Sequence, residues 1–207
     1  MGTELKQAIA ERLAAAGTPA GARPARSDYD LNPEYRPERQ PALKPAAVLV
    51  PLVERGAGFH VLLTRRAAHL NAHAGQISFP GGGVEADDDG VEAAALRETE
   101  EEIGIAAHYI ELVGRLDVYE TVTHYAVTPV VGFVRPGFRL SIDPFEVEEA
   151  FEVPLAFLMD PGNHLRHGGW HNGIRRQWWA MPYGDYYIWG ATAGMLRDLY
   201  RRVGDLC

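Results

Sequence analysis

The pattern of hydrophobic positions predicts a β-rich core. Residues 46–52 form a continuous apolar run, which is typical of a buried strand. A second apolar run at 59–64 follows a turn that contains Gly56 and Gly58, so the two runs are expected to pair. Similar patterns predict further strands over residues 110–118 and 125–134, and a hairpin from 177–181 and 186–189 around the turn 182–185.

Helical patterns flank and interrupt these strands. Residues 91–102 contain mostly strong helix formers, with Val91, Ala94, Ala95 and Ile103 placed to form a buried stripe. Three aspartates at 87–89 offer N-caps for this helix, and Gly104 is a natural residue to end it. Other helices are predicted over residues 4–15, 148–158 and 192–203.

The chain divides into two unequal parts. Residues 17–43 are rich in Pro, Ala, Arg and Asp and show little hydrophobic periodicity. We therefore predict a helix and an extended arm over residues 1–44, followed by one folded domain over 45–207. A chain of 207 residues is long enough to bury a sizeable core.

The composition of the chain excludes some classes of function and indicates a cellular compartment. The formal net charge of −8 argues against a general nucleic-acid binder, because phosphate backbones require a basic surface. No apolar run is long enough to span a membrane, and the first residues lack the apolar core of a signal peptide. Cys207 is the only cysteine, so no internal disulfide is possible. We expect a cytoplasmic protein.

The most informative polar segment is the cluster of glutamates at 98 and 100–102. Glutamates three and four apart on a helix repel one another, and a cation relieves that repulsion. On a helix Glu98, Glu101 and Glu102 share one face, whereas Glu100 is rotated away from it. Oxygen ligands beside the glycine turn at 81–83 favour Mg²⁺ or a similar hard cation. The alternative is a solvated acidic helix face.

Residues 83–105 resemble the Nudix box, a glycine- and glutamate-rich motif. The matching residues are Gly83, Arg97, Glu98, Glu101, Glu102, Gly104 and Ile105. Asp89 stands where the box usually has Glu, and the resemblance implies that it pairs with Arg97. Thr99 replaces an aliphatic residue, for which we expect a small stability cost.

The resemblance implies a fold and a chemistry. The expected fold is of the α+β class, an α/β/α sandwich around a mixed β-sheet. The cofactor is expected to be Mg²⁺ or Mn²⁺, with Glu98 and Glu102 as first ligands and Glu101 on a second ion or a metal-bound water. A carbonyl of Gly82 or Gly83 is expected to complete the shell. The predicted general base is Glu146, with Glu148 and Glu149 as alternatives.

A longer resemblance indicates a substrate. Residues 62–65, 69–70, 73, 75–77 and 79–82 are similar to the signature that precedes the box in coenzyme A pyrophosphatases, although Arg66 stands where that family often has Ser. Segments 125–132, 151–155 and 188–193 continue the match. The resemblance implies hydrolysis of coenzyme A or its thioesters to adenosine 3′,5′-bisphosphate and 4′-phosphopantetheine, or its acylated form. The predicted substrate-binding residues are Arg65, His73, Gln76 and Gly82.

Several alternatives stay open. Arg65 is nearly as well explained by a surface ion pair, and we expect Trp178, Trp179 and Trp189 to serve packing. One alternative substrate is another nucleoside diphosphate derivative such as ADP-ribose. The alternative from another class is a non-catalytic nucleotide-binding module. A homodimer is possible, with the arm as part of its interface.

Overall fold

A nine-stranded mixed sheet forms the centre of the protein. The computed structural model describes residues 2–16, 24–39, 42–56, 58–70, 73–171 and 173–207. The main path of the sheet is β1-β7-β8-β2-β3-β4, with β5 paired to β2, β6 to β8 and β9 to β3. Its strands are β1 (Arg26–Ser27), β2 (Lys44–Arg55), β3 (Gly58–Arg66), β4 (Ile77–Ser78), β5 (Gly81–Gly83), β6 (Ile110–Arg115), β7 (Tyr119–Glu120), β8 (Tyr125–Val134) and β9 (Val147–Pro154).

Strand β2 lies in the middle of this sheet and is buried on both faces. It runs parallel to β8 and antiparallel to β3, so the sheet is mixed. Ala46, Val50 and Leu52 point into one apolar core, whereas Leu49 and Val53 point into the other. The sequence correctly predicted β2, β3 and β8 as strands, because continuous apolar runs are typical of such two-sided burial.

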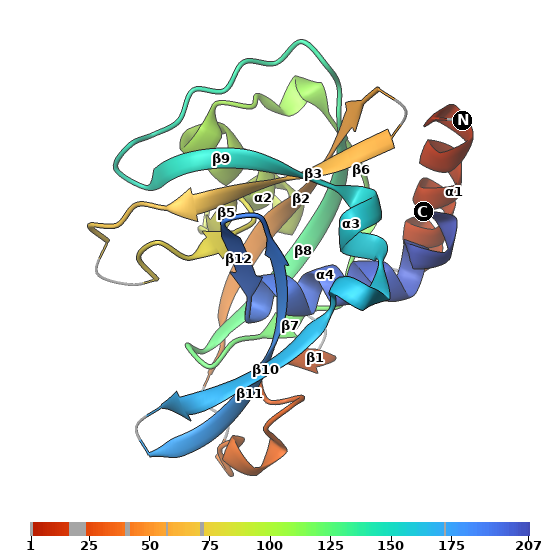
Figure 1. The fold of residues 1–207 in the computed structure, drawn as a ribbon. Helices are drawn as coiled ribbons and strands as arrows, with labels where there is room; N and C mark the ends of the chain where they lie inside the picture. Colours follow the sequence, from red (N-terminus) through yellow and green to blue (C-terminus); the bar gives the residue numbers. More distant parts are fainter. Residues whose placement is uncertain (1, 17–23, 40–41, 57, 71–72, 172) are drawn as a thin grey trace.

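Helices cover both faces of the sheet, as the predicted α/β/α sandwich requires (Figure 1). Helix α2 (Gly90–Ile103) packs on one face through Ala94, Ala95 and Ile103. On the other face lie α1 (Gly2–Ala16), α3 (Leu155–Met159) and α4 (Ala191–Val203). In the part of the chain that the structure describes, no helix is long and apolar enough to cross a membrane.

The ends of α2 follow the sequence prediction closely. Asp89 is the residue before the first helical turn, although its side chain makes no cap hydrogen bond. Gly104 ends the helix in the left-handed conformation, with φ of 74°. Thr99 is fully buried and its hydroxyl donates to the Ala95 carbonyl at 2.6 Å, so its polar group is satisfied inside the core.

The N-terminal helix is packed on the domain core. Ile9 and Leu13 of α1 are fully buried, and the Leu13 backbone lies against Gly114 of β6. Arg12 forms an ion pair with Asp205 near the C-terminus at 2.9 Å. The arm that follows adds β1 to the edge of the sheet beside β7. The division of the chain at residue 44 remains a prediction.

A separate three-stranded antiparallel sheet extends from the body of the protein (Figure 1). It consists of β10 (Leu165–His171), β11 (Ile174–Tyr183) and β12 (Tyr186–Trp189). The predicted hairpin corresponds to β11 and β12. Asn32 of the arm joins this sheet, because its side chain donates to the Gln177 carbonyl and accepts from the Gln177 backbone N–H.

Two element predictions need correction. The helix predicted over residues 148–158 is wrong for most of its length, because β9 occupies Val147–Pro154 and only Leu155–Met159 is helical. Pairing with β3 explains the difference, since it fixes these residues in an extended conformation despite their helix propensity. The strand predicted over 110–118 ends at Arg115.

The left-handed end of α2 yields a stability prediction. A methyl group at Gly104 would approach the Ser141 Cβ at 2.7 Å, in addition to the strain of the positive φ. We expect Gly104→Ala to lower the free energy of unfolding by about 2–4 kcal/mol, measured by urea denaturation. Gly184→Ala is the matched control, because Gly184 also has a positive φ but nothing lies within 4 Å of the added carbon. Equal losses in the two variants would contradict a role for the Ser141 contact.

Candidate active site

The candidate site lies where α2 packs on the glycine strand β5. Strand β5 pairs with β2 and brings the backbone of Gly81–Gly83 beneath the helix. The Glu98 carboxylate lies directly against Gly82, because a methyl group there would fall within 2.6 Å of its oxygens. The Glu102 carboxylate accepts a hydrogen bond from the Gly81 backbone N–H at 3.2 Å. Only a residue without a side chain at position 82 leaves room for the Glu98 carboxylate.

Arg97 binds the loop before α2, but through a different aspartate from the one predicted. Its guanidinium donates two hydrogen bonds to Asp88, at 2.9 and 3.0 Å, so the predicted Asp89–Arg97 pair is wrong. Asp89 is exposed instead and precedes the helix directly. The hydrogen bonds from Arg97 lower the pKa of Asp88. Arg97 also donates to the Gly83 carbonyl at 3.1 Å, and so ties the loop, β5 and α2 together.

The glutamates of α2 occupy three different environments. Glu102 is 3% exposed and Glu98 is partly buried, whereas Glu100 is exposed as predicted. The Glu101 side chain is 60% exposed and forms an ion pair with Arg97 at 2.9 Å. Glu98 also pairs with Arg97, at 3.0 Å. The inner part of the site is therefore formed by Glu98 and Glu102, with Glu101 at its rim.

Burial and mutual repulsion disfavour the ionised forms of the two inner carboxylates. Burial raises the pKa of Glu102 to about 7, with smaller contributions from the negative charges of Glu146 and Glu98. The Gly81 N–H and the Arg66 guanidinium, which lies 3.8 Å from Glu102, oppose this shift. Burial likewise raises the pKa of Glu98. A cation beside these carboxylates would favour their ionised forms.

The donor set fits a hard divalent cation. Over the described ranges, no three histidine, cysteine, aspartate or glutamate side chains converge closely enough to enclose a metal ion. Mg²⁺ does not require such a cage, because it is usually held by one or two carboxylates together with waters and substrate phosphates. Glu98 and Glu102 supply the two carboxylates, and the backbone of Gly82 lies beside them.

Glu146, the predicted general base, comes from a loop that is fastened to the end of α2. The Ser141 N–H donates to the Ile103 carbonyl and the Asp143 N–H to the Glu102 carbonyl, at 2.9 and 3.0 Å. The exposed Glu146 follows in this loop, and its negative charge acts on both Glu98 and Glu102. The loop therefore brings a third negative charge, from a distant part of the sequence, close enough to raise the pKa values of the two inner carboxylates.

The other candidates for the general base are placed differently. Glu149 forms an ion pair with Arg65 at 3.0 Å and accepts a hydrogen bond from the Tyr186 hydroxyl at 3.3 Å. Glu148 is exposed on β9. For Arg65, the ion-pair alternative is the one that the structure contains, and its guanidinium also lies over the Tyr186 ring.

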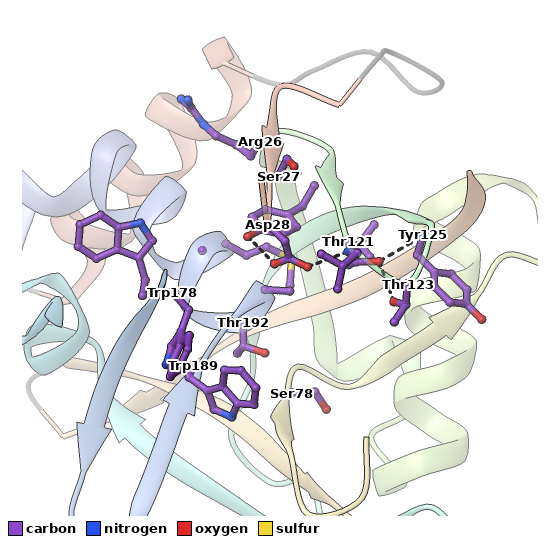
Figure 2. Close-up of a pocket in the computed structure, with 18 of the residues that line it drawn as sticks. Arg26, Ser27, Asp28, Ser78, Thr121, Thr123, Tyr125, Trp178, Trp189 and Thr192 are labelled. Carbon is purple, nitrogen blue, oxygen red and sulfur yellow. Dashed lines mark hydrogen bonds between the residues drawn. The ribbon is translucent and has the colours of Figure 1, made fainter. Parts of the chain in front are cut away.

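A cavity of about 540 Å³ opens beside the glycine strand. Gly81–Gly83, His73 and Gln76 line one part of it, and the His73 Nδ1 lies 2.8 Å from the Gln76 Oε1. Figure 2 shows four other elements around the cavity: the arm with Asp28, β4 with Ser78, β12 with Trp189 and α4 with Thr192. The substrate-binding residues predicted from the upstream signature, except Arg65, therefore share one cavity.

Sequence reasoning missed part of this cavity. Arg66, noted only as a departure from the resemblance, lines it and faces Glu102. The tryptophans at 178, 179 and 189 were expected to serve packing, but all three also line the cavity. Trp178 and Trp189 do contact each other edge to face, with ring centroids 5.7 Å apart. No local pattern distinguishes an aromatic residue that packs in a core from one that faces a cavity.

Comparison with known proteins establishes the family. The model of the NUDIX domain matches residues 43–171, which is more than half of the chain. The Nudix hydrolase NudL of Escherichia coli O7:K1 is 43% identical over 159 residues, covering 77% of this chain and 82% of the relative. NudL of Escherichia coli O6:H1 is 42% identical over the same length. The chain belongs to the Nudix hydrolase family.

Solved structures agree with this fold. The MutT protein from Methanosarcina mazei Go1 has a TM-score of 0.52 at 20% identity, over 81% of this chain and 97% of that protein. DR0079 from Deinococcus radiodurans has a TM-score of 0.51 at 14% identity, over 81% and 89% of the two chains. At these identities the similarity concerns the fold alone.

The raised pKa of Glu102 gives a prediction about stability without metal. Folding raises this pKa from 4.5 to about 7, so the ionised carboxylate destabilises the folded state. The penalty begins above about pH 4.5, grows to about pH 7 and is constant beyond. We expect Glu102→Gln to raise the free energy of unfolding by about 2–3 kcal/mol at roughly pH 8, and to change it little at roughly pH 4.

The measurement is urea denaturation in the presence of a chelator at both pH values. Glu101→Gln is the control, because its exposed carboxylate has no such burial penalty and should give no gain in stability at either pH. A Glu102→Gln variant no more stable than the parent at about pH 8 would show that ionisation of the Glu102 carboxylate does not destabilise the folded state.

Proposed function

We propose that the protein hydrolyses the diphosphate bond of coenzyme A or its thioesters, with Mg²⁺ or Mn²⁺ as cofactor. The products would be adenosine 3′,5′-bisphosphate and 4′-phosphopantetheine or its acylated form. The observation that carries the proposal is that His73, Gln76 and the glycine strand line one cavity, and that the carboxylates of Glu98 and Glu102 lie against that same glycine strand. These residues are among those on which the resemblance to coenzyme A pyrophosphatases rests.

The cation would be held by Glu98 and Glu102, together with a backbone oxygen at Gly82. Glu101 would act from the rim, on a second ion or a coordinated water. A divalent cation neutralises the diphosphate oxygens and makes water more acidic, which is the chemistry that this reaction requires. Arg97 acts by position, since its bonds to Asp88 and Gly83 hold the glycine strand against the helix.

Glu146 is proposed to accept the proton of the attacking water. It is exposed and carries no ion pair among the described residues, whereas Glu149 is engaged by Arg65. The influence of its negative charge on the pKa values of Glu98 and Glu102 supports this role. Arg66 would face the diphosphate, because it lines the cavity next to Glu102.

The alternative within the same chemistry is another nucleoside diphosphate derivative, such as ADP-ribose. The cavity of about 540 Å³ lies within the usual range for ligand pockets, so its size alone does not separate coenzyme A from ADP-ribose. A non-catalytic module is less consistent with the site, because a binding module has no need of buried, mutually repelling carboxylates.

A substrate panel tests the proposed reaction. The purified protein is incubated with Mg²⁺ or Mn²⁺ and with coenzyme A, acetyl-coenzyme A or ADP-ribose, and the products are separated by mass-resolved chromatography. We expect adenosine 3′,5′-bisphosphate and phosphopantetheine from coenzyme A, with loss of activity on chelation and in Glu102→Gln. Equal or better turnover of ADP-ribose would overturn the assignment of coenzyme A, and no turnover of any compound would favour the non-catalytic module.

A second variant tests the general base. We expect Glu146→Gln to lower kcat by about 10²- to 10⁴-fold, with KM and the metal concentration required for half-maximal activity nearly unchanged. Glu148→Gln is the matched control, because it removes an exposed carboxylate two residues away and should keep near-parental kcat. A larger loss of kcat in Glu148→Gln than in Glu146→Gln would exchange their roles.

A further inference from the structure

Helix α4 carries more positive charge into the cavity than its neighbours neutralise. Arg26 and Arg202 share two carboxylates, with Arg26 3.5 Å from both Asp117 and Asp198, and Arg202 at 2.7 and 3.3 Å from them. Arg197 and Arg201 form no ion pair with any residue in the described part of the chain. Both line the cavity, and they are four residues apart on one helix, where like charges repel.

Arg197 is held in place without a hydrogen-bonding partner for its inner nitrogen. Its guanidinium lies over the Trp179 ring, 3.3 Å from the ring centroid. Its Nε is buried and, within the residues that the structure describes, makes no hydrogen bond. Burial, followed by the positive charges of Arg201 and Arg26, lowers the pKa of Arg197. A guanidinium that is oriented, partly desolvated and surrounded by like charge is prepared for an anion from outside the chain.

The position of Arg197 relative to the glutamate site is set by the start of α4. The Thr192 hydroxyl donates to the Ile77 carbonyl at 2.9 Å and so fastens the first turn of α4 to β4, close to the glycine strand. Arg197 follows five residues later, about 7.5 Å further along the helix axis. The cavity continues from Gly81–Gly83 to Arg197 and Arg201. One ligand can therefore reach both regions.

We infer that Arg197 and Arg201 form a second anion site, which binds a phosphomonoester that the nucleoside part of the substrate carries apart from its diphosphate. This inference rests on the proposed function and specifies the class of substrate. A nucleoside diphosphate derivative with a 3′-phosphate carries such a dianionic phosphomonoester on its ribose, apart from the diphosphate, whereas ADP-ribose carries none. The two arginines would discriminate between these substrates, since their guanidinium groups gain a charge-assisted hydrogen bond from a 3′-phosphate and none from ADP-ribose at this position.

Stacking alone does not account for the arrangement. A structural role for Arg197 on Trp179 requires neither a second unpaired arginine at 201 nor a cavity in front of them. The neighbouring Arg26 and Arg202, by contrast, are both neutralised by aspartates.

The test compares the binding of adenosine 3′,5′-bisphosphate and AMP by calorimetry, so that it does not depend on turnover. We expect the parent protein to bind the bisphosphate at least about 10-fold more tightly than AMP, and Arg197→Met to lose that preference by about 10- to 100-fold. Methionine keeps an apolar side chain on Trp179, and Arg197→Lys, which restores the charge, should recover part of the preference. Thermal unfolding verifies that each variant is folded.

Two further variants keep the test decisive. Arg201→Gln changes an exposed residue, so the fold should be retained, and we expect a several-fold loss of the preference. Arg139→Gln removes an exposed arginine outside the cavity and should change nothing. Equal weakening of both ligands in Arg197→Met, or no preference in the parent protein, would overturn the second anion site. Failure of the proposed reaction would appear separately, as no cleavage of coenzyme A by the parent protein.

Discussion

The close contact between helix α2 and the glycine strand β5 is the interaction on which the candidate site depends. Because Gly82 has no side chain, the Glu98 carboxylate reaches the backbone of β5, and the Gly81 N–H binds Glu102. The same contact buries the two carboxylates and raises their pKa values. Burial of these two carboxylates thus lowers the stability of the fold, and it holds negative charge in a position where a cation could bind. Arg97 maintains the arrangement from the outside through Asp88 and Gly83.

Local patterns in the sequence were sufficient for the elements that bear this contact. The apolar runs of β2, β3 and β8, the helix formers of α2 and the terminal Gly104 each have one structural interpretation, and the structure agrees with it. The prediction for residues 148–158 failed because pairing with β3 overrides the helix propensity of a short segment. The sequence also could not show that Arg97 binds Asp88 and not Asp89, because this depends on how the loop turns before the helix.

Residues that meet only through the fold were the hardest to predict. Glu146 was chosen through a resemblance, and only the hydrogen bonds from its loop to the end of α2 explain why it lies near Glu98. The cavity wall brings together the arm, the small sheet and α4, which are far apart in the chain (Figure 2). That Arg197 and Arg201 have no ion pair within the described part of the chain becomes visible only when each nearby aspartate has been assigned to its partner.

The parallel pairing of β2 with β8 has a consequence for how the protein folds. Ala47 of β2 lies opposite Gly82 of β5 on one side and Thr128 of β8 on the other. The strand β2, which supports the glutamate site through β5, therefore gains its second neighbouring strand from a segment much later in the chain. The arm and α1 likewise pair with residues beyond 110. Contacts of such long sequence separation form slowly, because the entropy of loop closure must be lost first. During synthesis, β2 is therefore exposed until β8 has emerged, and the carboxylates of Glu98 and Glu102 reach their final positions late.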